Sequence, residues 1–182
     1  MARLSQAIAE GDRISILVEV HDASTAERAE RQGADGLVAG RGATEVRASS
    51  NLPLLHRGGT VDASGAAADA IIVSVDSSAW HESEAFGLEA VVRVSRTDAL
   101  ERALDLLDPE ILLLTVDQES DDDPLEALLA LLHDVPAGKL AIAELPDATA
   151  EDVAELERAG VDAVLVATTE IASLVPDGPP DV

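Results

Sequence analysis

The chain has 182 residues, enough for one domain with a substantial core, and its 47% hydrophobic content excludes a disordered acidic tail. Its 36 acidic and 12 basic residues give a net charge of −24, and this deficit of basic side chains disfavours nucleic-acid binding. The absence of cysteine excludes disulfides, thiolate nucleophiles and Cys-ligated metals.

Eight short aliphatic runs recur along the chain, and several consist of consecutive apolar residues without polar alternation. Such runs are typical of parallel strands that are covered on both faces. In chain order, the predicted strands are Ser15–Val20, Gly36–Ala39, Leu52–His56, Ala70–Val75, Ala90–Ser95, Ile111–Val116, Leu140–Glu144 and Ala163–Ala167.

Helical segments are predicted between several of these strands. Three of them cover Ser24–Asp35, Arg96–Leu107 and Thr149–Asp162. A fourth covers residues 121–134, where three acidic residues and a proline favour a helix N-terminus. The connections over residues 42–51 and 60–69 are expected to hold only a turn of helix.

A partial internal repeat supports alternating strands and helices. Residues 19–40 and 144–168 share a strand-ending Glu, an Asp-Ala-Ser/Thr turn, an Ala/Glu-rich helix and a Gly-x-Asp before the next strand. Eight such strands predict a compact (β/α)₈ TIM barrel, with an open doubly wound sheet as the alternative. Because ordinary barrels exceed about 200 residues, we expect trimmed loops and some short or missing helices. We assign residues 1–175 to a single barrel domain and residues 176–182 to a flexible tail.

The strand motifs resemble those of indole-3-glycerol-phosphate synthase, in the ribulose-phosphate-binding barrel superfamily. The segment AELPDATAEDVAELERAGVDAVLVATTEI (143–171) is similar to that family's AESGI-x-TPEDV…AGADAVLVGES. LPLLHRGG (52–59) resembles PVLRKDF, and VEVHDAS (18–24) resembles AEIKRAS. LEAVVRVSRTDALERAL (88–104) resembles LVEVHDEEELERAL. The similarity extends over most of the chain and is most specific in its last third.

The resemblance implies a site at the carboxyl ends of the strands, with several substituted residues. The first-strand glutamate is kept as Glu19, but His21 stands where the family has a lysine. The general-acid lysine of the third strand becomes Arg57, and the fifth-strand glutamate becomes Arg93. The sixth-strand asparagine falls at Thr115. A guanidinium does not deprotonate near neutral pH, so Arg57 can hold an anion but cannot donate and recover a proton.

The family's phosphate site is also altered. The seventh-strand glutamate is kept as Glu144, but the small residues that follow it are replaced, and Pro146 has no N–H to offer a phosphate. Ala167 occupies the position of a glycine after the eighth strand, and Thr168 follows it. Ser24 remains at the position of the family's phosphate-contacting serine.

These substitutions predict a divergent paralogue without synthase activity that binds a small anionic metabolite through Arg57 and Arg93. The first alternative is an active carbon–carbon lyase that uses Glu19 and Glu144, with His21 in proton transfer. The second is a non-catalytic scaffold that acts through an oligomer interface. The charges at the barrel mouth could equally neutralise one another and merely close it, since buried charges must be paired.

Partners and location follow from composition. The acid-rich sequence, in which Lys139 is the only lysine, resembles proteins from salt-accumulating archaea, and its charge is read as a solvated surface. No cofactor or metal is expected, because His21 and His56 should point in different directions.

The N-terminus lacks a signal peptide and no apolar stretch reaches 18 residues, so we expect a cytoplasmic protein that does not bind membranes. The acidic loop 117–123 is read as solvated and as capping the next helix.

Overall fold

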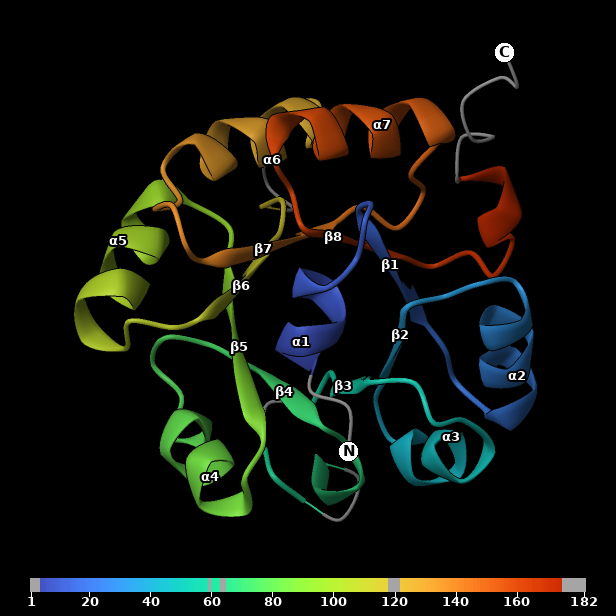
Figure 1. Ribbon diagram of the computed structural model, residues 1–182. Helices are drawn as coiled ribbons and strands as arrows, with labels where there is room; N and C mark the ends of the chain where they lie inside the picture. Colours follow the sequence, from blue (N-terminus) through green and yellow to red (C-terminus); the bar gives the residue numbers. More distant parts are fainter. Residues whose placement is uncertain (1–3, 59, 63–64, 118–121, 175–182) are drawn as a thin grey trace.

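A closed ring of eight parallel strands is the centre of the molecule (Figure 1). The computed structural model describes residues 4–58, 60–62, 65–117 and 122–174. Each strand pairs with the next in the chain, and β8 pairs with β1, so the predicted (β/α)₈ barrel is confirmed and the open sheet is excluded. The predicted tail and most of the acidic loop 117–123 lie outside the described residues.

All eight predicted runs form strands, and the observed ends differ from the predicted ones by at most two residues. The strands are β1 (Ser15–Glu19), β2 (Gly36–Ala39), β3 (Leu54–His56), β4 (Ala70–Val73), β5 (Glu89–Val94), β6 (Ile111–Leu114), β7 (Leu140–Glu144) and β8 (Ala163–Val166).

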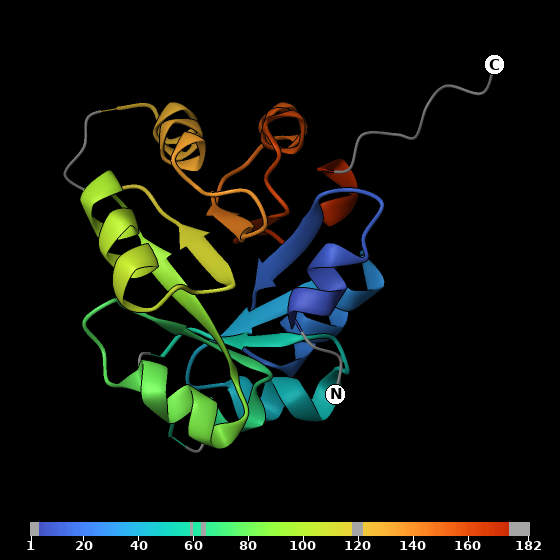
Figure 2. The ribbon, with the colours of Figure 1, turned by 60° about the vertical axis from the view of Figure 1, so that its left-hand side comes forward.

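The helices lie outside the ring of strands, except for the first one (Figure 2). They are α1 (Leu4–Ala9), α2 (Ala23–Arg31), α3 (Ala43–Ser49), α4 (Ala79–Phe86), α5 (Thr97–Leu106), α6 (Pro124–His133) and α7 (Ala150–Ala159). In the residues that the structure describes, the connections after β3 and β8 contain the 3₁₀ turns η1 (Gly65–Ala67) and η2 (Ile171–Ser173) and no α-helix, as expected of a barrel with short or missing helices. No helix in the described ranges is long and apolar enough to cross a membrane.

Three helical segments differ from the sequence-based expectation. The connection after β2 forms the seven-residue helix α3 rather than a single turn, because Val46 packs into the core and Arg47 donates to three backbone carbonyls beyond the helix or at its end. Helices α1 and α4 were not predicted. In α1, Leu4 and Ile8 are four residues apart and both are buried at the amino-terminal end of the barrel.

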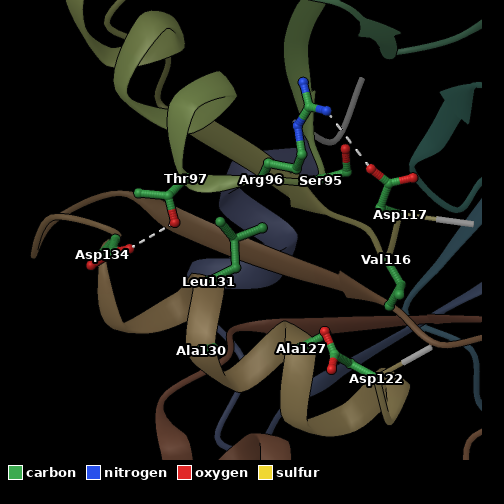
Figure 3. Close-up of a pocket in the computed structure, with 10 residues that line it drawn as sticks. All are labelled: Ser95, Arg96, Thr97, Val116, Asp117, Asp122, Ala127, Ala130, Leu131 and Asp134. Atoms are coloured by element: carbon green, nitrogen blue, oxygen red, sulfur yellow. Dashed lines mark hydrogen bonds and ion pairs between the residues drawn. The ribbon is translucent and has the colours of Figure 1, made fainter. Parts of the chain in front are cut away.

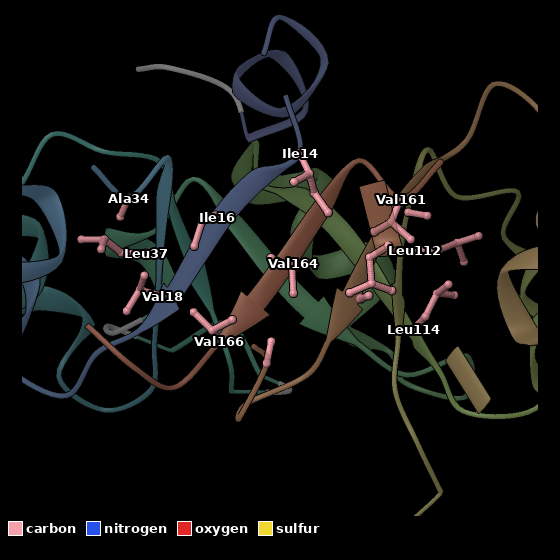
Figure 4. Close-up of a cluster of buried hydrophobic side chains, with 14 of the residues drawn as sticks. Ile14, Ile16, Val18, Ala34, Leu37, Leu112, Leu114, Val161, Val164 and Val166 are labelled. Atoms are coloured by element: carbon pink, nitrogen blue, oxygen red, sulfur yellow. The ribbon is translucent and has the colours of Figure 1, made fainter. Parts of the chain in front are cut away.

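The core has two layers on opposite faces of the strands. One layer lies between strands and helices and includes Ile16, Val18 and Val164 (Figure 4). The other fills the barrel interior and also includes Leu4 and Ile8 of α1, which lies over the centre of the ring in Figure 1. Because α1 closes the amino-terminal end, the carboxyl-terminal mouth is the end of the barrel that remains for a site.

Candidate functional site at the barrel mouth

Four of the predicted site residues share one layer of the barrel. Side chains two apart along a strand point to the same face, and a barrel layer takes one residue from each alternate strand. Strands β1, β3, β5 and β7 contribute one interior residue each: Leu17, Leu55, Val91 and Ile142. Two residues farther along these strands, toward the mouth, come Glu19, Arg57, Arg93 and Glu144. The mouth layer of the odd-numbered strands therefore consists of two carboxylates and two guanidinium groups.

The even-numbered strands place small uncharged residues at the same end. The interior residues nearest the mouth on these strands are Val38, Ile72, Leu113 and Leu165, and two positions beyond them lie Gly40, Ser74, Thr115 and Ala167. Thr115 continues the β6 ladder, since its N–H donates to the carbonyl of Val94 at 2.9 Å. The four charged side chains are thus separated by residues that take little space.

Arg57 is shared by both glutamates. Its Nη1 lies 2.7 Å from Glu144 Oε1, and its Nε lies 3.2 Å from Glu19 Oε1. Its Nη2 also donates to Glu19 Oε2 at 3.3 Å. The Nε–H is buried and, despite the close carboxylate, is not aligned for a hydrogen bond. The three side chains are 27%, 27% and 13% exposed for Arg57, Glu19 and Glu144, so this unit of net charge −1 is only partly solvated.

Arg93 differs from Arg57 in its partners. It is exposed, its Nε donates to Thr115 Oγ1 at 3.5 Å, and among the described residues it forms no ion pair. It lines a pocket of about 440 Å³ together with the hydroxyl residues Ser74, Ser95 and Thr115 and the carboxylate of Asp117. Arg93 is therefore a cation at the mouth without an ion pair in the described chain, while Asp117 of the same pocket lies 3.9 Å from Arg96 Nη1.

A second mouth pocket, of about 540 Å³, lies over the ends of β1 to β3. Its lining includes Glu19, His21, His56, Arg57 and Asp62. The His56 imidazole is buried, with Nε2 3.9 Å from Asp62 Oδ1 and Nδ1 without a hydrogen-bond partner. Both histidines thus line one pocket, although no group of three or more His, Asp or Glu suited to a metal occurs in the described part of the chain.

The loops after β7 and β8 bond to each other. The N–H of Leu145 donates to the carbonyl of Leu165, and the N–H of Ala167 donates to the carbonyl of Pro146, both at 3.0 Å. The N–H of Glu170 donates to Thr168 Oγ1 at 3.1 Å. These amides, which lie where the resemblance places a phosphate nest, are therefore already occupied.

The remaining predicted residues lie apart from the charged layer. Ser24 is exposed in the first turn of α2, and the adjacent Asp22 carboxylate accepts the N–H of Thr25 at 2.8 Å, which starts the helix. This bond from the Thr25 backbone lowers the pKa of the Asp22 carboxyl below its usual value. Ser24 and Thr168 line neither of the two mouth pockets.

A pocket that the sequence did not indicate lies between α5 and α6 (Figure 3). It has a volume of about 560 Å³ and is lined by the loops that follow β5 and β6. Arg96 Nη1 lies 3.9 Å from Asp117 Oδ2, and Thr97 Oγ1 donates to Asp134 Oδ2 at 3.1 Å. None of the predicted site residues lines this pocket.

Sequence reasoning also missed Ser74 and Ser95 beside Arg93. Ser74 follows Ile72 by two positions, so the alternation along β4 could have placed it at the mouth. Ser95 is the first residue after β5, and its place in the pocket depends on the course of the following turn. No short-range pattern identifies it.

Comparison with known proteins agrees with the strand motifs. No family model matches the chain. The indole-3-glycerol phosphate synthase of Variovorax paradoxus (strain S110) is 35% identical over 135 residues, which cover 67% of this chain and 51% of that protein. The chain thus matches about half the length of this relative.

Two solved structures show the same fold at low identity. The N-acetylmannosamine-6-phosphate 2-epimerase of Clostridium perfringens gives a TM-score of 0.74 at 14% identity, over 96% of this chain and 92% of that one. The thiamine phosphate pyrophosphorylase of Pyrococcus furiosus gives a TM-score of 0.67 at 13% identity, over 88% and 90% of the two chains. The chain is therefore similar in sequence to an indole-3-glycerol phosphate synthase over part of that protein's length, and it has the fold of a closed (β/α)₈ barrel.

Proposed function

We propose that this barrel has lost the synthase reaction and binds a small anionic metabolite at its mouth, with Arg93 as the main anion contact. The observation that carries the proposal is the unequal pairing of the two arginines. Arg57 contacts both Glu19 and Glu144, while Arg93 forms no ion pair among the described residues. The Arg57 guanidinium already pairs with two carboxylates of the protein, whereas the Arg93 guanidinium can contact a ligand.

Loss of the synthase reaction is supported first by the general-acid position. A guanidinium stays protonated at any pH at which the protein functions, so Arg57 cannot pass a proton to substrate and recover it. Two carboxylates also hold it, the nearer at 2.7 Å. Removal of a single transition-state donor commonly costs about 10²–10³ in rate, and the lysine that the resemblance places at His21 is also replaced.

The second support comes from the loops that would hold phosphate. Pro146 supplies no N–H, and the N–H of Ala167 donates to the Pro146 carbonyl at 3.0 Å. A phosphate at the family's position would have to displace this bond. The anion is therefore expected at the ends of β4 to β6, where Arg93 is accompanied by the hydroxyl groups of Ser74, Ser95 and Thr115. Asp117 also lines this pocket and lies 3.9 Å from Arg96.

The anion site can be tested by thermal shift and calorimetry with inorganic phosphate and ethyl phosphate in high-salt buffer. We expect both anions to raise the melting temperature and Arg93→Gln to abolish the effect. Arg28→Gln is the matched control, because Arg28 is an exposed arginine on α2 away from the mouth. An unchanged response in Arg93→Gln, or no response in the wild-type chain, would refute the proposed site.

A retained lyase activity is the second candidate, because Glu19 and Glu144 both point into the mouth. The decisive measurement is formation of indole glycerol phosphate from its carboxyphenylamino-deoxyribulose phosphate precursor by the purified chain. Complementation of a tryptophan auxotroph gives an independent answer. Product formation that Glu144→Gln abolishes would replace the non-catalytic proposal with the lyase.

A further inference from the structure

The charged mouth layer is neutral as a whole, but its charges are unevenly compensated. Glu19 and Glu144 contribute −2, and Arg57 and Arg93 contribute +2. Both carboxylates contact Arg57, which leaves that unit with a net charge of −1 and leaves Arg93 with +1. This layer therefore presents a partly buried negative excess and a separate positive group, and Asp117, in the same pocket as Arg93, pairs with Arg96.

We propose that the ligand is a small zwitterion that places its phosphate or carboxylate at Arg93 and its ammonium group at the Glu19–Arg57–Glu144 unit. This inference rests on the proposed function and names the class of molecule bound. An anion alone compensates Arg93 and leaves the negative excess of the glutamates. An amine alone leaves Arg93 unpaired. A molecule with both charges compensates both.

The strand register brings the two charge centres within reach of one small molecule. Arg93 Nε contacts Thr115 Oγ1, and Thr115 lies beside Glu144 because Leu114 and Ala143, the preceding residues, are partners in the β6–β7 ladder. Strands β5 and β7 are separated only by β6, so their backbones lie about 10 Å apart at the usual spacing of neighbouring strands.

The residues at the ends of the even-numbered strands are small and uncharged. Thr115 follows β6 at this level, and Ser74 and Ala167, which follow β4 and β8, are also small. A ligand ammonium can join the carboxylates without displacing Arg57, since a carboxylate has about four acceptor sites.

Isothermal titration calorimetry on the full chain, with three matched molecules, tests the inference. O-phosphoethanolamine carries both charges, ethyl phosphate lacks the amine, and ethanolamine lacks the phosphate. A charge-assisted hydrogen bond adds enough free energy for us to expect O-phosphoethanolamine to bind at least about tenfold more tightly than ethyl phosphate. Ethanolamine should bind more weakly than either.

Variants distinguish the two charge centres. Glu144→Gln should reduce the preference for O-phosphoethanolamine over ethyl phosphate to nearly one, while ethyl phosphate binds as tightly as before or more tightly. Glu19→Gln is the second test of the same centre if Glu144→Gln fails to fold. Glu27→Gln, at an exposed position on α2, should leave the preference unchanged.

The possible outcomes separate this inference from the function on which it rests. Equal affinity for O-phosphoethanolamine and ethyl phosphate, both dependent on Arg93, would overturn the zwitterion and leave the anion site intact. A preference that survives both glutamine variants would also overturn it. No binding of either phosphate, or ethanolamine binding as tightly as O-phosphoethanolamine, would overturn both proposals.

Discussion

Replacement of Arg57 by methionine should destabilise the barrel, because it removes the cation between Glu19 and Glu144. Methionine retains much of the apolar length of arginine, so the change acts mainly on charge. Two ion pairs are lost, with N–O distances of 3.2 and 2.7 Å. Exposed pairs contribute about 0.2–1 kcal/mol each, and breaking a fully buried pair costs about 3–5 kcal/mol. With side chains 13–27% exposed, we expect a loss of about 2 kcal/mol in the free energy of unfolding.

Urea denaturation followed by far-ultraviolet circular dichroism measures this loss, and the fluorescence of Trp80 provides a second probe. For a domain of this size, 1 kcal/mol corresponds to about 2–4 °C, so the melting temperature should fall by about 4–8 °C. Adding Glu19→Gln and Glu144→Gln to Arg57→Met should restore most of the stability, because it removes the two facing carboxylates. A loss below about 0.5 kcal/mol in Arg57→Met, or a further loss in the triple variant, would refute the electrostatic reasoning.

Three other measurements test the core, a helix cap and the surface charge. Leu165→Ala in the barrel interior should cost about 2–5 kcal/mol in chemical denaturation, while Leu106→Ala, at a side chain 66% exposed, should change stability by less than about 0.5 kcal/mol. The hydrogen bond from Thr25 lowers the pKa of Asp22, so this carboxylate stabilises the folded state above its unfolded pKa of about 4 and ceases to do so as pH falls through the folded value. The melting temperature of Asp22→Ala should therefore lie below that of the wild type at neutral pH and converge with it in acid; a constant gap would contradict the assignment. Since the net charge is −24, the melting temperature should rise with NaCl concentration, and a fall would show that charge repulsion is not significant.

The strands could be predicted from the sequence because their signal is local. Parallel strands with both faces covered consist of consecutive apolar residues, and Gly36–Ala39 and Leu140–Glu144 were predicted with their observed ends. Helices α1 and α4 could not be predicted for different reasons. Helix α1 has six residues and depends on the burial of Leu4 and Ile8 in the barrel, and α4 mixes aromatic, polar and small residues without a clear apolar stripe.

For the site, the sequence predicts which residues gather but not how they pair. Strand alternation and the resemblance together place Glu19, Arg57, Arg93 and Glu144 at one end of the barrel. The same information does not decide whether these charged side chains pair with one another and fill the mouth or bind a ligand there. Pairing depends on side-chain directions across the barrel, which the strand pattern does not contain. The structure pairs Arg57 with both glutamates and leaves Arg93 with a hydroxyl contact.

The positive charge of Arg93 explains why a single substitution back to the family's glutamate at this position is not expected to rebuild the family's active site. With a glutamate on β5, as the resemblance implies for the synthases, the odd-numbered strands would place three carboxylates around a single cation, for a net charge of −2. Arg93 brings this layer to zero but removes a carboxylate that the synthase reaction needs. Arg93→Glu should therefore destabilise the barrel, since Arg57 already contacts two carboxylates and cannot neutralise a third. Adding Arg57→Lys would return an exchangeable proton to the end of β3, yet the N–H of Ala167 would still donate to the Pro146 carbonyl across the loops after β7 and β8. Synthase activity in this double variant would show that those loops do not exclude the phosphate, and the anion site at Arg93 would then lose its second support.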